Sequence, residues 1–225
     1  MLRKSFVLFF CSCIISFGCQ SDKAKSKSDE STSKSIDKNR YNSTLSPLRS
    51  AYNTRAFEAE KAVKFHLKLS TEDSVFFDGN LILNTEGTEI KIKNSKLDTV
   101  LNTQKMESKF EKIVLWSAEL YALPFWIQTD KALKPFEKDS LIGFKYKSRL
   151  SDTDFEIFKH PQTHIIEKVN YSTDIKTKPF DKGVLTYYKY ITVNRIPVAM
   201  TWIIEGENNI IAKAEISRIS YPDKL

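Results

Sequence analysis

Apolar and polar residues alternate along much of this chain, beginning with Val63, Phe65 and Leu67, which Lys64 and His66 separate. A period of two is typical of a β-strand that buries one face and exposes the other. The same alternation, or a short apolar run between turn residues, predicts nine to ten strands. They are expected at 63–69, 75–83, 90–93, 97–102, 141–150, 154–159, 164–171, 183–193, 198–205 and 210–221. Because short turns join them, these strands should form an antiparallel meander, and so many twisted strands in one sheet usually curl.

The period changes once near the middle of the chain. Phe110, Val114 and Tyr121 recur at three- and four-residue spacing, as the apolar stripe of a helix does, and charged residues lie between them. This pattern predicts an amphipathic helix over about residues 106–122, and Pro124 is expected to end it because proline lacks a backbone N–H.

A shorter helix is predicted at 46–60, where Ser46 can cap the first turn and Pro47 suits the first helical position. The predicted fold class is therefore mainly β with α. We expect a single strongly curved antiparallel sheet, an open half-barrel, whose concave face is covered by the mid-chain helix.

The N-terminus has a basic head, Arg3-Lys4, followed by an apolar run that ends at Phe17. A run of roughly 12 residues suits a signal peptide and is shorter than the ~20 residues of a spanning helix, although an uncleaved anchor is the alternative. With Gly18-Cys19 after it, the segment resembles a bacterial lipoprotein signal. The resemblance implies that residues 1–18 are removed and that Cys19 is acylated, with fatty acids such as palmitate. Several chains are implied, because one acyl chain binds a membrane only marginally.

Composition limits what the mature chain can be. The cysteines are Cys11, Cys13 and Cys19, so cleavage would leave one cysteine and no internal disulfide. Four of the seven net positive charges fall within residues 1–40, which leaves the rest nearly balanced, without the basic stripe that nucleic-acid binding needs. Residues 19–45 are rich in Ser, Lys and Asp and are predicted to be a flexible tether between the lipidated cysteine and a domain at 46–225.

The second half of the chain has a characteristic order of strands and turns. The strand containing Asp154-Phe155-Glu156-Ile157-Phe158 leads to a turn at Pro161-Gln162-Thr163, and Tyr188-Lys189-Tyr190 and Ile196-Pro197 precede a long last strand. Together with Pro124-Phe125 after the central helix, this layout resembles the periplasmic lipoprotein-carrier fold of LolA-like and LppX-like proteins, and a group of bacterial lipoproteins of unassigned function. The resemblance implies a curved, incompletely closed sheet whose cavity binds acyl chains or other lipids.

The side chains expected to line such a cavity come from the central helix and the apolar cluster after it. They are Phe110, Val114, Leu120, Phe125, Trp126 and Ile127. The alternative is that these side chains belong to an ordinary hydrophobic core and line no cavity. The sequence contains no nucleophile elbow, phosphate loop or paired-cysteine motif, and His160 and His164 flank a proline turn, so no catalysis, metal or cofactor is expected.

The sequence therefore predicts an envelope lipoprotein, anchored to the outer membrane on its periplasmic or outer side, that binds a hydrophobic ligand in the concavity of its sheet. The alternative is an interaction module that binds a protein or glycan through the outer sheet face. Its candidate aromatic residues are Tyr187, Tyr188, Tyr190, Trp202 and Tyr221.

Overall fold

The computed structural model describes residues 34–35, 38–94, 98–102, 108–127, 133–138, 141–148 and 150–223. The chain divides into two units, Met1–Ser31 and Thr32–Leu225, and every described residue belongs to the second. The predicted signal peptide and Cys19 thus lie outside the described residues. Among the described helices, none is long and apolar enough to cross a membrane.

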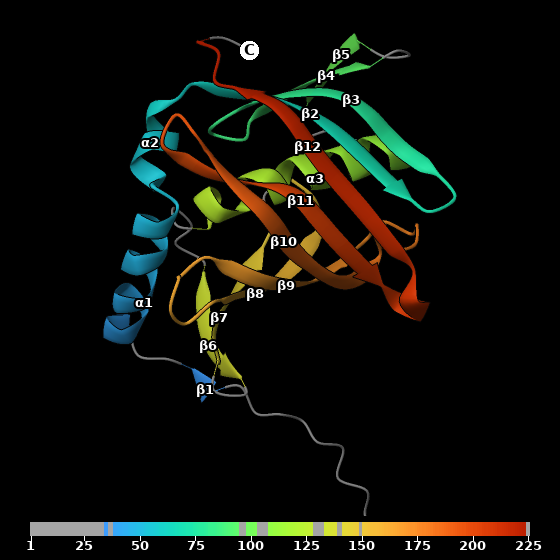
Figure 1. Cartoon of the computed structure of the whole chain (residues 1–225). Coiled ribbons are helices and arrows are strands. Elements are labelled where there is room, and N and C mark those ends of the chain that lie inside the picture. Colours follow the sequence, from blue (N-terminus) through green and yellow to red (C-terminus); the bar gives the residue numbers. More distant parts are fainter. Residues whose placement is uncertain are drawn as a thin grey trace, which may run out of the picture. The chain divides into compact units, whose positions relative to one another are not determined.

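One antiparallel sheet of twelve strands dominates the second unit (Figure 1). The strands are β1 (Lys34–Ser35), β2 (Ala62–Thr71), β3 (Val75–Asn84), β4 (Glu89–Asn94), β5 (Asp98–Asn102), β6 (Lys134–Lys138), β7 (Leu141–Lys147), β8 (Thr153–Lys159), β9 (Ile166–Thr173), β10 (Lys182–Val193), β11 (Ile196–Gly206) and β12 (Ile211–Ser220). Their order is β1-β6-β7-β8-β9-β10-β11-β12-β2-β3-β4-β5, so the sheet is open, with β1 and β5 at its edges.

The predicted fold class, a single open antiparallel sheet with few helices, is confirmed. The predicted number of strands was too low because β1 and β6 were missed. β1 has only two residues, in a stretch without alternation, and β6 is a five-residue strand that contains Pro135, a residue usually confined to strands near a sheet edge.

The last strand of the chain, β12, lies in the interior of the sheet between β11 and β2. β12 pairs with β2, and Ala214 and Ile216 lie opposite Leu69 and Leu67. All four side chains are buried, as the period-two pattern of β2 predicted. This pairing joins the N-terminal strands β2–β5 to the C-terminal meander β6–β12.

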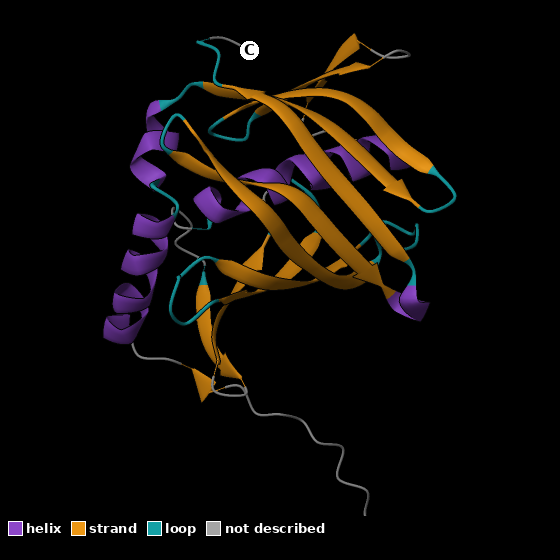
Figure 2. Cartoon of the chain, in the orientation of Figure 1, coloured by secondary structure: helices purple, strands orange, loops and turns teal. Residues whose placement is uncertain are grey.

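Helix α3 (Lys109–Trp126) lies within the curve of the sheet (Figure 2). It starts with a capping box: Ser108 Oγ accepts the Glu111 N–H at 3.2 Å, and Glu111 Oε2 accepts the Ser108 N–H at 3.0 Å. Every residue from Ile113 to Trp126 is buried, so α3 is enclosed on all sides rather than amphipathic as predicted.

The hollow that α3 was predicted to cover is instead filled by α3 itself. Tyr121 stacks on Phe65 of β2 with ring centroids 4.2 Å apart, and Trp116 lies against Tyr171 of β9 at 5.1 Å. The opening between α3 and strands β10 and β11 has a volume of about 10 Å³, the size of a single water molecule. The concave face, as far as it is described here, is therefore packed with the protein's own side chains.

The first helix also differs from its prediction. α1 (Lys38–Ala51) begins eight residues before Ser46 and contains Pro47, so its first residues come from the predicted tether. α2 (Thr54–Ala59) follows a break at Asn53, whose φ of 46° is left-handed. Tyr52, between α1 and α2, ties these helices to the sheet, because its hydroxyl accepts the Ile166 N–H of β9 at 3.0 Å.

Pro124 does not end α3 but lies in its last turn. Because proline has no N–H, the carbonyl of Leu120 loses its helical donor. The hydroxyl of Tyr187 on β10 donates to Leu120 O at 2.8 Å in its place. Burial raises the pKa of Tyr187 well above its ordinary value, so this hydroxyl stays protonated. The sheet thus supplies the hydrogen bond that the proline removes.

We expect Tyr187→Phe to lower the free energy of unfolding by about 1–3 kcal/mol, because it leaves a buried carbonyl unpaired. In a Pro124→Ala background the alanine N–H can donate to Leu120 O, so the same substitution should cost clearly less. Urea denaturation of the four proteins measures the difference. Tyr188→Phe, on the exposed side of the same strand, is the control and should change stability little. Equal costs of Tyr187→Phe in both backgrounds would contradict the assignment.

Candidate functional site

A pocket of about 540 Å³ opens at the C-terminal end of α3. Its walls come from α2 and the link to β2, from the turn between β3 and β4, and from the last residues of α3. The lining residues are Phe57, Glu58, Ala59, Glu60, Lys61, Asn84, Thr85, Glu86, Phe125 and Trp126. Three segments distant in sequence therefore meet around one hollow.

Three aromatic rings of the core, each less than 5% exposed, lie directly beneath this pocket and form its floor. Phe57 of α2 stacks on Phe125 of α3 with centroids 4.0 Å apart and the ring planes at 7°. Tyr52 meets the same Phe125 ring edge-on at 5.9 Å. The indole N–H of Trp126 donates to Thr85 O at 2.7 Å, which ties the end of α3 to the β3–β4 turn. The floor is thus held by contacts on three elements.

The β3–β4 turn is a rigid wall. Asn84 Oδ1 accepts the backbone N–H groups of Thr88 at 2.8 Å and Glu89 at 3.2 Å, a pattern that closes the turn on its own side chain. Thr85 Oγ1 donates to Glu60 O at 2.7 Å, which fastens the turn to the start of β2. These hydrogen bonds fix the conformation of the turn and its position against β2.

The structure brings two of the six predicted ligand-binding residues, Phe125 and Trp126, to the pocket. Val114, Leu120 and Ile127 are buried in the core. Phe110 lies near the other end of α3, where it is half-buried against Phe77 at 6.0 Å. Helical spacing could not separate these roles, because α3 is buried on every side.

The pocket residues outside α3 were missed by the sequence analysis. Phe57 and Glu60 belong to the predicted helix 46–60, Lys61 follows it, and Asn84 and Thr85 follow the predicted strand 75–83. Nothing in their spacing marks them as neighbours of Trp126, because tertiary packing alone brings them together.

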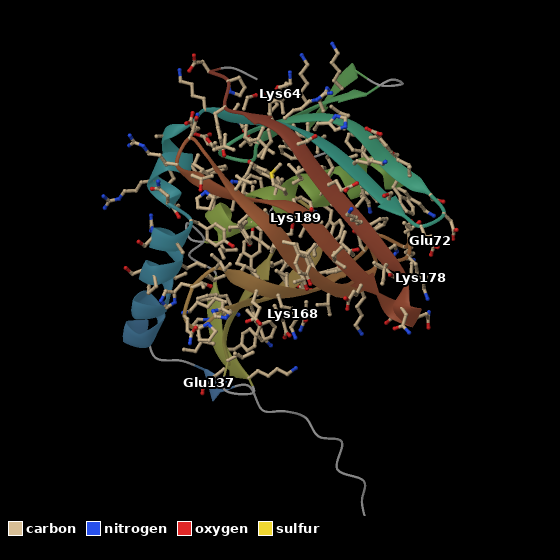
Figure 3. The ribbon with its side chains drawn as sticks, viewed as in Figure 1. Lys64, Glu72, Glu137, Lys168, Lys178 and Lys189 are labelled. Atoms are coloured by element: carbon tan, nitrogen blue, oxygen red, sulfur yellow. The ribbon has the colours of Figure 1, made fainter. Side chains whose placement is uncertain are left out.

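Other hollows in the described part are, like this pocket, lined mainly by polar and charged residues. One of about 630 Å³ lies along β8 to β11 and includes Asp154, Glu156 and Glu205, and one of about 650 Å³ lies by the β2–β3 turn and includes Glu72. Figure 3 labels charged side chains over the sheet and at its turns, among them Lys64, Glu72, Lys168, Lys178 and Lys189, all exposed. Tyr171 is the aromatic residue that lines the hollow along β8 to β11.

The aromatic residues proposed for an outer binding face are divided by the structure. Tyr187 and Trp202 are buried, Tyr190 and Tyr221 are half-buried, and Tyr188 is 48% exposed. A glycan-stacking platform needs several exposed rings together, so this arrangement does not favour the outer-face alternative.

The histidines are engaged locally. His160 Nδ1 accepts the N–H groups of Gln162 and Thr163, both at 3.2 Å, and His164 Nδ1 lies 3.2 Å from Lys159 Nζ. Both belong to the β8–β9 turn, as predicted. Across the described ranges no three His, Cys, Asp or Glu side chains are grouped so that they could hold a metal ion.

One fully buried carboxylate was not predicted. Glu119 of α3 accepts hydrogen bonds from Ser148 Oγ at 2.5 Å and Ser151 Oγ at 2.8 Å, beside the end of β7. Ser148 Oγ also accepts the N–H groups of Leu150 at 3.0 Å and Ser151 at 2.6 Å, which occupies its lone pairs. This geometry suits an anchor for α3 rather than an activated nucleophile.

Gly87 lets the β3–β4 turn pack closely against the ring of Trp126. Its φ is 77°, and a Cβ built there would lie 2.8 Å from the Trp126 ring. We expect Gly87→Ala to lower stability by about 1–3 kcal/mol through backbone strain and this clash. In a Trp126→Leu background the clash disappears and only the strain persists, so the cost should fall, as urea denaturation can measure. An undiminished cost would mean that the ring does not lie over Gly87.

Comparison with known proteins gives similarities of structure alone. No protein-family model matches this sequence, and no curated protein matches it. A DUF1329 family protein from Desulfovibrio piger is 8% identical, with a TM-score of 0.41, over 81% of this chain and 94% of that one. A LolA superfamily protein from Nitrosomonas europaea is 7% identical, with a TM-score of 0.39, over 79% and 94%.

A domain from Vibrio parahaemolyticus named for outer membrane lipoprotein sorting is 10% identical, with a TM-score of 0.41, over 81% of this chain and 94% of that one. At such low identity these similarities concern the fold and carry no ligand or residue role to this chain.

Proposed function

We propose that this chain is an envelope lipoprotein that binds a hydrophobic ligand, an acyl chain or a lipid, without catalysis. The binding site is the pocket at the C-terminal end of α3. One observation carries the proposal: Phe57, Phe125 and Trp126, each less than 5% exposed, border a hollow of about 540 Å³ whose other walls are mainly polar. Small-molecule sites are typically hollows of ~300–1,000 Å³ with apolar and aromatic linings.

The interior of the sheet is a poorer site than this end. A ligand between α3 and the sheet would have to displace the helix, because the opening there is about 10 Å³. Displacement would break the buried hydrogen bonds between Tyr187 and Leu120 and between Ser151 and Glu119. Binding at the end of α3 requires none of these losses, so the proposed ligand position moves from the concavity to this pocket.

The driving force would be desolvation of apolar surface. Burying roughly 300 Å² of apolar surface, most of it on the ligand, at about 25 cal/mol per Å² yields ~7.5 kcal/mol before the costs of immobilising the ligand. Those costs take a substantial share, so we expect dissociation constants of roughly 0.1–1 mM for a single alkyl chain. Tight retention of a lipid would need contacts beyond the floor.

Anchoring is the second part of the proposal. Cys19 is the expected lipidation site, and residues 20–33 connect it to β1. The ligand pocket would then work at a membrane, either in the periplasm or at the outer surface, with the membrane as its partner through acyl chains such as palmitate.

The pocket can be tested by filling it. Ala59 is exposed and lines the hollow, so Ala59→Trp should occupy it without removing core packing. We expect at least tenfold weaker binding of dodecyl maltoside, measured by calorimetry below its critical micelle concentration. Glu72→Trp, in the hollow by the β2–β3 turn, is the matched control and should bind normally. Absence of binding to the wild type, or equal losses in both variants, would refute the site.

The anchor has its own test. Cys19→Ala should move the protein from the membrane fraction to the soluble fraction, because the thiol is the expected acyl acceptor. Fractionation followed by a high-salt wash measures this. Retention of the variant on salt-washed membranes would contradict lipid anchoring at Cys19.

A further inference from the structure

We propose that the outer face of the sheet from β6 to β9 docks on an anionic phospholipid surface. The docking surface consists of Lys134 and Lys138 of β6, Lys145 of β7 and Lys168 of β9. This inference rests on the anchoring part of the proposed function, because a lipid anchor would bring this surface to a membrane. Two features support it: the place where the chain enters the sheet and the distribution of charge.

The chain enters the domain at this end of the sheet. β1 pairs with β6, with Lys34 opposite Glu137 and Ser35 opposite Phe136. Figure 1 shows both strands at the end of the fold away from the C-terminus. Because Cys19 precedes Lys34 by 15 residues, an anchor at Cys19 can lie at most about 50 Å from β1. Such a connection keeps the nearby lysines at a high effective concentration at the membrane surface.

The positive charge of the domain is concentrated in the two segments that supply this end. Residues 32–51, which contain β1 and α1, and residues 133–151, which contain β6 and β7, together carry nine basic and three acidic residues. The other residues of 32–225 carry 21 basic and 22 acidic residues. The charge of the domain is therefore polarised, and its basic end would be attracted to a negatively charged surface.

Strand alternation places three of the lysines on the outer face. Phe144 and Tyr146 of β7 belong to the core, so Lys145 between them faces outward. Lys134 of β6 lies directly opposite Lys145, and Lys138 is four residues further along the same strand, which returns it to the same face. The three side chains therefore share one side of the sheet.

A pair of aromatic rings supports the lysines. Phe136 and Phe158 both lie opposite Gly143, and their rings meet edge-on with centroids 5.4 Å apart. Lys145 Nζ lies 5.4 Å from the centroid of Phe136, and Lys168 Nζ lies 5.2 Å from that of Phe158. Both rings are less than 5% exposed, so this surface presents ammonium groups and not apolar carbon.

Most of these charges are available to a partner. Within the described ranges no ion pair involves Lys134, Lys138 or Lys168, and the fourth lysine pairs with Glu156 at 3.5 Å. Because that pair is partly exposed, it contributes little. Together with Glu167, which precedes Lys168, Glu156 leaves an excess of two positive charges. A lysine near anionic head groups strengthens binding about fivefold.

Vesicle binding tests the surface without the anchor. The full chain carrying Cys19→Ala is sedimented with phosphatidylcholine vesicles, either neutral or with about 30% phosphatidylglycerol as the anionic lipid. We expect this parent protein to prefer the anionic vesicles. Adding Lys134→Gln, Lys138→Gln and Lys168→Gln should weaken its binding to them at least tenfold, and salt should weaken the parent more than this variant.

The matched control removes the same charge from the other end of the sheet. Lys64→Gln, Lys68→Gln and Lys91→Gln on β2 and β4 should leave binding within about twofold of the parent, because these lysines lie outside the docking surface. Equal binding of the parent to both vesicles, equal losses in the two triple variants, or no loss from the docking-surface variant would refute the surface. These outcomes do not depend on acylation, whose failure would appear separately in the fractionation of Cys19→Ala.

Discussion

The structure depends on the enclosure of one helix by one open sheet. An open sheet of twelve strands cannot cover its concave face by closing, so an apolar body has to fill it. α3 fills this face, and its buried residues from Ile113 to Trp126 contact both the N-terminal strands and the C-terminal strands of the sheet. Tyr121 packs on β2, Trp116 packs on β9, and Glu119 is bound beside β7.

This constraint determines the position of the proposed ligand site. A sheet with a covered but empty hollow could hold a lipid inside, but here the helix has taken that volume. Open space appears at the C-terminal end of α3, where Phe125 and Trp126, 2% and 4% exposed, border a hollow. The β3–β4 turn and α2 complete the walls. The position of the pocket therefore depends on where α3 ends as well as on the residues that line it.

The sequence predicted the sheet well but did not reveal which segments meet around the pocket, and the reason is the range of the interactions. The alternation of Val63 to Leu69 is a local signal, and it assigned the buried face of β2 correctly. The end of α3 is not local: Pro124 is tolerated because Tyr187, on a strand far along the chain, bonds Leu120 O. No pattern within a helix can reveal that partner, so the helix was predicted to end too early.

The pocket was out of reach for the same reason. Phe57 stacks on Phe125 across 68 positions of sequence, and Thr85 accepts from Trp126 across 41. The apolar cluster that includes Phe125 and Trp126 was recognised from its composition, but composition does not distinguish a core from a pocket floor. Local patterns therefore predicted the helices and strands, whereas tertiary packing determined which of their residues line a pocket.

Hydrogen–deuterium exchange of the full chain, with and without dodecyl maltoside, tests the central claim most directly. If α3 fills the sheet and the ligand binds at its end, amides from Ile113 to Leu120 should be strongly protected in both states, and added protection should be confined to residues 57–61 and 84–87. Fast exchange within α3, or ligand-dependent changes centred on Ile113 to Leu120, would show instead that the helix leaves the hollow to admit the ligand.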